Sequence, residues 1–138
     1  MLQASRGLKV ATWVVQIAVA AILFQTLYFK FSAAPESVYI FSKLGMEPAG
    51  RIGSGVAELV AGVMLLIPSL AALGALLALG VISGAVLSHL TVLGIEVQGD
   101  GGLLFGLALV VLLGSLFVLF VRRRELPVVG RWFQKEAA

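Results

Sequence analysis

The stretch that decides the fold is IGSGVAELVAGVMLLI, residues Ile52 to Ile67. It is apolar except for the hydroxyl of Ser54 and the carboxyl group of Glu58 near its middle, and such a run predicts a membrane-spanning helix. An ionised carboxylate inside a bilayer costs from about 2.5 kcal/mol upward. Glu58 therefore needs a partner or a function, and the rest of the chain is best interpreted around it.

The helical face that carries Glu58 is made of small residues. Residues three, four or seven positions apart share one face of a helix, and the neighbours of Glu58 on this criterion are Arg51, Ser54, Gly55, Ala61 and Gly62. Small side chains allow helices to approach closely in lipid. We expect this face to point into a helix bundle rather than toward lipid.

The composition predicts an integral membrane protein with one domain. Hydrophobic residues make up 60% of the 138 positions and charged residues only 12%, whereas a soluble domain is about half apolar and a quarter charged. Cysteine is absent and there is one histidine, which excludes disulfides, iron–sulfur ligation and bis-histidine haem ligation within one subunit. Any redox chemistry must be supplied by a bound cofactor or a partner.

Three further apolar runs complete an all-α, four-helix membrane bundle over residues 1–138. The expected spans are residues 10–31, 52–67, 70–93 and 102–121, and Pro68-Ser69 forms a tight turn between the second and third. A basic segment, residues 122–138, follows the fourth span. Three adjacent arginines beside a span, Arg122 to Arg124, are typical of an anchor to anionic lipid, and we expect no nucleic-acid partner.

The segment between the first two spans predicts a short helix at the membrane surface. Pro35 and Glu36 are typical of a first helical turn and Gly45 of a stop. Val38, Phe41 and Leu44 recur at helical spacing between polar residues. The alternative interpretation is an irregular loop with some apolar residues.

The distribution of basic residues predicts the orientation. Seven lie on the side of the two termini and three on the opposite side: Arg6, Lys9, Arg122, Arg123, Arg124, Arg131 and Lys135 against Lys30, Lys43 and Arg51. Basic residues favour the cytoplasmic side. We expect a multi-pass protein of the cell inner membrane with both termini cytoplasmic.

Small residues at four-residue spacing predict close helix packing. They form one stripe on each of three spans: Gly53, Ala57 and Ala61; Gly80, Gly84 and Ser88; and Gly102 and Gly106. Such stripes are typical of helix–helix contacts in membranes. Whether one of them serves a homodimer stays open at this point.

One group of polar residues is a candidate site. Three of the spans bring these residues to one zone of the outer leaflet: Glu58, Lys30, His89, Gln25 and Arg51. In a structural interpretation, Lys30, Arg51 or Ser54 satisfies Glu58, while Lys30 extends to the interface and His89 is an interfacial hydrogen-bonding residue. In a functional interpretation, the group handles a proton or a polar ligand, and a carboxylate plus a histidine beside lipid suits a quinone headgroup. The sequence contains no self-contained catalytic motif and predicts no metal site.

Over residues 10–121 the chain resembles the DoxX family of small four-span membrane proteins. The stretches that carry the resemblance are Phe29-Lys30-Phe31 followed by Pro35, Leu44-Gly45-Met46-Glu47-Pro48, Gly55-Val56-Ala57-Glu58-Leu59-Val60-Ala61-Gly62 with Leu65-Leu66, and Ser88-His89-Leu90. The resemblance carries over Lys30, Glu58 and His89 as the polar positions of the family pattern.

The resemblance implies two classes of function, since the family includes both. The first is a membrane-embedded accessory subunit of an oxidoreductase or respiratory complex that contacts quinone through Glu58 and His89. The alternative is a non-enzymatic assembly factor, chaperone or interaction protein. Either implies a partner protein in the membrane or a homo-oligomer, in addition to the lipid bilayer. A solute pathway is less favoured, because no span shows the internal break expected of a transporter.

Overall fold

The computed structural model describes residues 1–127 and 130–135, and this part of the chain is helical without strands. Its long helices are α1 (Arg6–Phe31), α3 (Ala49–Leu65), α4 (Ala71–Ser88) and α5 (Leu103–Arg122). Each belongs to a helical segment long and apolar enough to cross a membrane, which gives four candidate spans in the described residues. The expected all-α four-helix bundle of a multi-pass membrane protein is confirmed.

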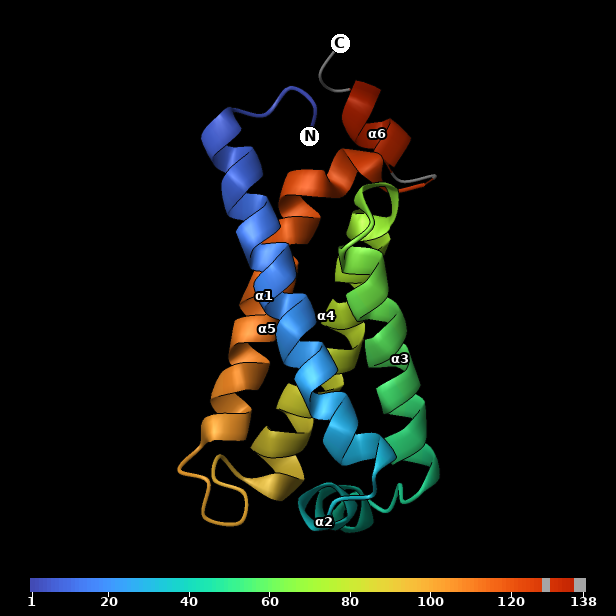
Figure 1. Cartoon of the computed structure of the whole chain (residues 1–138), viewed down its shortest axis with the longest axis vertical. Coiled ribbons are helices and arrows are strands. Elements are labelled where there is room, and N and C mark those ends of the chain that lie inside the picture. Colours follow the sequence, from blue (N-terminus) through green and yellow to red (C-terminus); the bar gives the residue numbers. More distant parts are fainter. Residues whose placement is uncertain (128–129, 136–138) are drawn as a thin grey trace.

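The four long helices lie side by side, with the N-terminus and α6 (Gly130–Lys135) at one end and α2 (Pro35–Lys43) across the other (Figure 1). We call these the terminal end and the α2 end. In the described part of the chain, α3 packs against α1 and α4, and α5 packs against α4 and α1. Basic residues follow the expected division, since Arg6 and Arg122 lie at the terminal end while Lys43 and Arg51 lie near α2.

Two helices begin earlier than their apolar runs. α1 starts at Arg6, because the side chain of Ser5 accepts a hydrogen bond from the backbone N–H of Leu8 at 3.2 Å and caps the helix. α3 starts at Ala49 rather than at Ile52. Hydropathy marks the membrane core, whereas a helix extends into the polar interface as far as its backbone remains hydrogen-bonded.

The surface helix predicted between the first two spans is confirmed as α2 (Pro35–Lys43), so the loop alternative is wrong. Pro35 occupies the first turn, and Gly45 follows the helix with a φ of 70°. Ser37 and Phe41 are buried against the bundle, while Tyr39 is exposed. α2 therefore closes the end of the bundle at which it lies (Figure 1).

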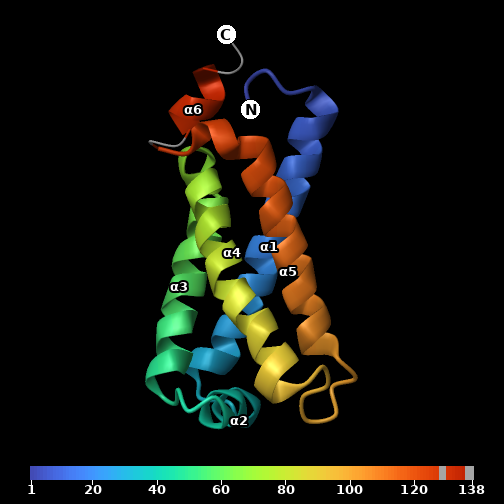
Figure 2. The same ribbon diagram turned by 180° about the vertical axis from the view of Figure 1, so that it is seen from behind.

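α3 and α4 are joined by the expected tight turn, here a 3₁₀ turn, η1 (Pro68–Leu70). A Cβ atom added to Gly74 would lie 2.7 Å from the backbone nitrogen of Leu65, so only glycine permits this approach. From this contact the two helices diverge toward the α2 end, where α1 is visible behind the gap (Figure 2). η2 (His89–Leu93), a wider turn of π-helix, extends α4 at that end.

The small-residue stripes pack differently from the prediction. Gly80, Gly84 and Gly106 would carry a Cβ without meeting any atom within 4 Å, so at these positions the stripes do not bring helices together within the chain. Close contacts occur instead at Gly55 and Gly62 of α3, where a Cβ would lie 2.8 Å and 2.5 Å from the rings of Phe31 and Phe24, respectively. The structure therefore packs α1 tightly against α3, and leaves space beside α4 at Gly80 and Gly84.

Candidate functional site

Glu58 of α3 forms an ion pair with Lys30 in the last turn of α1. The Lys30 Nζ atom donates to Glu58 Oε1 at 2.6 Å, and the two side chains are only 15% and 6% exposed. The Lys30 ammonium also lies 5.6 Å from the centre of the Phe41 ring on α2, within the range of a cation–π contact. The expected partner for Glu58 is confirmed, and Lys30 turns into the bundle instead of extending to the interface.

Thr26 completes the surroundings of the Glu58 carboxylate. Its hydroxyl lies 2.8 Å from Glu58 Oε2 and 2.7 Å from the carbonyl oxygen of Leu23, and its single proton serves one of these acceptors at a time. The sequence interpretation placed Gln25 in this group, but Gln25 is exposed and forms no hydrogen bond with it. The missed signal is the spacing of Thr26, which lies four residues before Lys30 and shares its face of α1.

Arg51 is buried beside this ion pair without contacting Glu58. Its Nε atom donates to Glu47 Oε1 and Oε2 at 2.9 Å and 3.0 Å, and its Nη1 atom donates to the carbonyl oxygen of Lys30. That carbonyl lies in the last turn of α1, where the helix offers it no partner. Arg51 therefore joins the end of α1 to the start of α3, and the alternative pairing of Glu58 with Arg51 is wrong.

His89 is held in a fixed orientation at the end of α4. Its Nδ1 atom lies 2.9 Å from the carbonyl oxygen of Gly94, and the N–H of Gly94 donates to the carbonyl oxygen of His89 at 2.8 Å. Because a carbonyl only accepts, Nδ1 donates this hydrogen bond, and Nε2 is the ring nitrogen left for another partner. No other residue of the described chain forms a hydrogen bond with this ring, which is 3% exposed and packs edgewise against Phe105.

Asp100 organises the loop that follows His89. Its carboxylate accepts hydrogen bonds from the backbone N–H groups of Val97, Gly102 and Leu104 at 2.8–3.1 Å. These bonds, that from Val97 most, lower the pKa of Asp100 below its ordinary value. The Leu104 bond caps the first turn of α5. The loop therefore positions Gly94, the partner of His89, relative to α5.

The Lys30–Glu58 pair, Thr26 and His89 line one cavity of about 690 Å³ at the α2 end of the bundle. Its polar lining includes Thr26, Lys30, Glu58, Ser88 and His89, and Gln25 also lies on its wall. Most of the other lining residues are apolar and come from α1, α2, α4 and α5, among them Ile22, Ile40, Val81 and Leu107. The structure thus places Lys30, Glu58 and His89 on one cavity, whereas Arg51 supports its wall from outside.

The chemistry of this cavity is that of hydrogen bonding and proton exchange beside apolar walls. It offers an ammonium group, a carboxylate, a hydroxyl and the ring of a histidine. Volumes of about 300–1,000 Å³ are typical of pockets that enclose a small ligand. Within residues 1–127 and 130–135 no three His, Cys, Asp or Glu side chains are grouped as metal ligands.

A second buried polar network, which the sequence interpretation missed, lies near the terminal end. Arg122 Nε donates to Gln16 Oε1 at 2.7 Å, and Gln16 Nε2 donates to the carbonyl oxygen of Leu65 at 2.7 Å. Arg122 Nη1 also lies 2.9 Å from Glu125 Oε2. Arg122 is 4% exposed, so its assignment to a lipid anchor is wrong. Gln16 was the signal in the sequence that could have predicted this network, because a glutamine within an apolar span requires a polar partner.

Comparison with known proteins gives no relative for this chain: no family model, no curated protein and no solved structure matches it. The resemblance to the DoxX family therefore stays a prediction from the sequence.

Proposed function

We propose that this protein is a membrane-embedded accessory subunit of an oxidoreductase complex, and that the cavity at its α2 end binds the headgroup of a quinone. The observation that carries the proposal is that Lys30, Glu58 and His89, from three different helical segments, line one cavity whose other walls are apolar. The proposal extends the resemblance to the DoxX family, whose pattern contains the same three residues.

The polar groups of the cavity suit the two redox forms of a quinone. The Lys30 ammonium has three N–H donors and uses one in its hydrogen bond to Glu58. The others remain to donate to a quinone carbonyl. The Nδ1 atom of His89 donates to the carbonyl oxygen of Gly94, so Nε2 is the ring nitrogen left to accept a hydrogen bond from a quinol hydroxyl. Protons can therefore be exchanged with the ligand, whereas the electrons come from a partner, because the chain has no cysteine and no second histidine.

The proposed setting is the cytoplasmic membrane with both termini on the cytoplasmic side. The excess of basic residues near the termini supports this orientation. The cavity then opens in the outer half of the bilayer, where a lipid-soluble ligand has access to it. Its redox partner is a protein of the same membrane.

A second function, a non-catalytic scaffold or assembly factor, is favoured by a specific observation. Glu58 is already satisfied within the chain, by Lys30 and Thr26, and Arg51 is satisfied by Glu47 and the end of α1. Such a network ties α1 to α3 without any ligand. If this function is correct, the cavity is a gap between packed helices, and the residues of the family pattern serve to hold α1 against α3.

Binding measurements on the purified protein in mild detergent separate the two functions. The probes are a tail-less benzoquinone and its quinol, and the variants are His89→Gln, which keeps a donor for Gly94 but removes the ring, and Glu58→Gln. We expect the parent to bind, and each variant to lose at least about tenfold in affinity, or about 1.4 kcal/mol. His89→Gln should leave the melting temperature nearly unchanged, whereas Glu58→Gln should lower it, because Lys30 loses its charged partner.

The matched control is Thr91→Val in the same turn as His89. Thr91 is exposed, bonds only to the carbonyl oxygen of Leu87 in its own helix, and lies outside the cavity lining. The Thr91→Val variant should bind both probes as tightly as the parent does. Absence of binding of either probe to the parent would favour the scaffold.

A further inference from the structure

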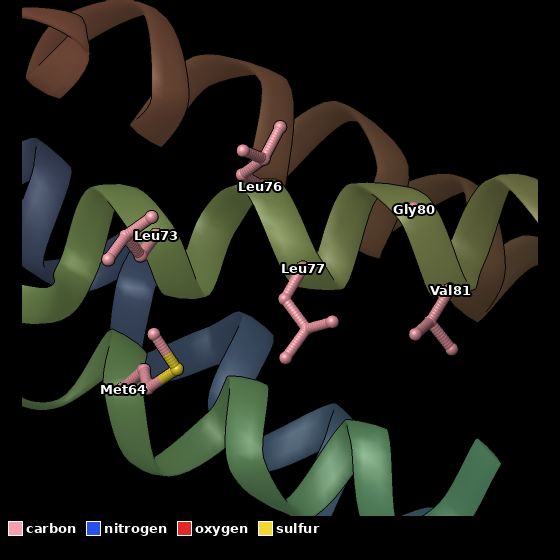
Figure 3. Close-up of a pocket in the computed structure, with 6 residues that line it drawn as sticks. All are labelled: Met64, Leu73, Leu76, Leu77, Gly80 and Val81. Atoms are coloured by element: carbon pink, nitrogen blue, oxygen red, sulfur yellow. The ribbon is translucent and has the colours of Figure 1, made fainter. Parts of the chain in front are cut away.

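A second hollow, of about 590 Å³, lies between α3 and α4 on the outside of the bundle. Its lining is entirely apolar and consists of Met64, Leu73, Leu76, Leu77, Gly80 and Val81. Figure 3 shows Leu77 and Val81 projecting from α4 on the side of α3, with Met64 of α3 opposite Leu73. The hollow offers no polar side chain to a ligand, so hydrocarbon is the chemistry that fits it.

This outer hollow and the cavity described above have two lining residues in common, Gly80 and Val81. Beside Gly80 and Gly84 a Cβ atom would meet nothing within 4 Å. α3 and α4 also diverge from their turn toward the α2 end (Figure 2). The two hollows therefore adjoin at Gly80 and Val81. We call the two together the crevice, which is apolar near the turn and partly polar near α2.

We infer that this crevice binds the long hydrocarbon tail of the same ligand whose headgroup the cavity holds, and that the ligand reaches the cavity from the bilayer between α3 and α4. The inference rests on the proposed function. The ligand is then an amphiphile with a hydrogen-bonding headgroup and a long apolar tail. Its headgroup lies near Glu58 and His89, and its tail crosses Gly80.

The dimensions agree with this arrangement. His89 lies nine residues from Gly80, which is roughly 14 Å along a helix at 1.5 Å per residue. Half of the hydrocarbon core of a bilayer is about 15 Å. A tail that starts beside His89 therefore reaches Gly80 near the middle of the membrane. Beyond Gly80 it lies along Leu77 and Leu73 toward the terminal end of the bundle.

The shape of the crevice favours a flexible tail over a helix of a second copy. A helix about 10 Å wide covers a surface groove, but it does not enter the deeper part of the crevice, where Glu58 and His89 are nearly buried. A helix seated on the apolar part would leave those polar groups beside an empty space. A tail joined to a polar headgroup fills both parts of the crevice.

The variant Gly80→Leu tests the inference. The space beside Gly80 accommodates the new side chain, so the variant should fold, and the leucine projects into the path of the tail. The matched control is Gly53→Leu, an exposed glycine of α3 that also has no neighbour within 4 Å of a Cβ and lines neither hollow. Both changes add the same side chain and the same helix propensity. The probes are two quinones with one headgroup, one tail-less and one with a long isoprenoid tail, titrated into protein in lipid nanodiscs.

We expect the preference for the long-tailed over the tail-less quinone to fall at least about tenfold in Gly80→Leu relative to the parent, through weaker binding of the long-tailed quinone, while Gly53→Leu keeps the preference of the parent. Equal affinity of Gly80→Leu and the parent for the long-tailed quinone would overturn the inference and leave the proposed function standing. A parent that binds neither quinone would overturn both. A parent that is dimeric by native mass spectrometry and becomes monomeric on Gly80→Leu would show that a second copy occupies the crevice, and would also overturn the inference.

Discussion

Lys30 Nζ lies 2.6 Å from Glu58 Oε1, and this contact joins the last turn of α1 to the middle of α3. Both groups are largely removed from solvent. Desolvation of two charges offsets much of their attraction, so such a pair adds little net stability, whereas removing one partner strands the other charge. The pair therefore specifies how α1 and α3 align, and it fixes the position of the Glu58 carboxyl group beside the cavity.

Glu58→Leu should lower the free energy of unfolding by about 3–5 kcal/mol, because it leaves the Lys30 ammonium without its partner. Lys30→Leu should have a similar effect, and the double variant should be more stable than either single one. Denaturant unfolding in detergent micelles gives the coupling free energy through a double-mutant cycle. A coupling near zero would mean that the pair does not form in solution.

Thr26 and Gln25 give a test of which residue belongs to the Glu58 group. Thr26→Val keeps the shape of the side chain and removes a hydrogen bond to a charged carboxylate, so it should cost about 1.5–3 kcal/mol. Gln25→Leu should change the free energy of unfolding by less than about 0.5 kcal/mol, since Gln25 is exposed. The same unfolding assay measures both variants, and the reverse order of effects would contradict the structure.

Gln16→Leu tests the network near the terminal end. The change leaves Arg122 Nε and the carbonyl oxygen of Leu65 without the partner they have in the structure, and each such loss costs about 1–3 kcal/mol. We expect a lower melting temperature and no change in the affinity for a tail-less quinone, because Gln16 does not line the cavity. Weaker quinone binding at an unchanged melting temperature would contradict this assignment.

The orientation is tested by labelling single cysteines in intact cells. The natural chain has no cysteine, and both Gln3 near the terminal end and Ser42 of α2 are exposed. An impermeant thiol reagent should label Ser42→Cys and should label Gln3→Cys only after the cells are opened. Labelling of Gln3→Cys in intact cells would reverse the assigned orientation.

Much of the fold follows from patterns that depend on one segment at a time. The apolar runs give the four spans, Pro35 and Gly45 delimit α2, and Pro68 marks the turn between α3 and α4. The need of Glu58 for a basic partner also follows from its position within a span, because an isolated charge there is too costly. These conclusions hold without knowledge of how the helices face one another.

The remaining features depend on the rotation and tilt of the helices, which the sequence constrains weakly. Gln25 and Thr26 differ by about 100° around α1, and only the packing against α3 decides which of them meets Glu58. Gly80 and Gly84 have the spacing of a packing stripe, but the divergence of α3 and α4 turns that stripe into the wall of a crevice. The run Arg122 to Arg124 is typical of a lipid anchor. Only the packing of α5 against α1, which brings Arg122 to Gln16, shows that Arg122 is buried.

The central claim, that the cavity at the α2 end holds a quinone headgroup, is tested most directly by photocrosslinking. A tail-less quinone with a photoreactive group is irradiated with the purified protein, and the labelled residues are mapped by mass spectrometry. We predict labelling within residues 22–30, 50–58 and 84–93, which line the cavity from α1, α3 and the end of α4, and its suppression by excess unlabelled quinone. Labelling that is spread over the lipid-facing surfaces, or that unlabelled quinone does not suppress, would contradict the claim.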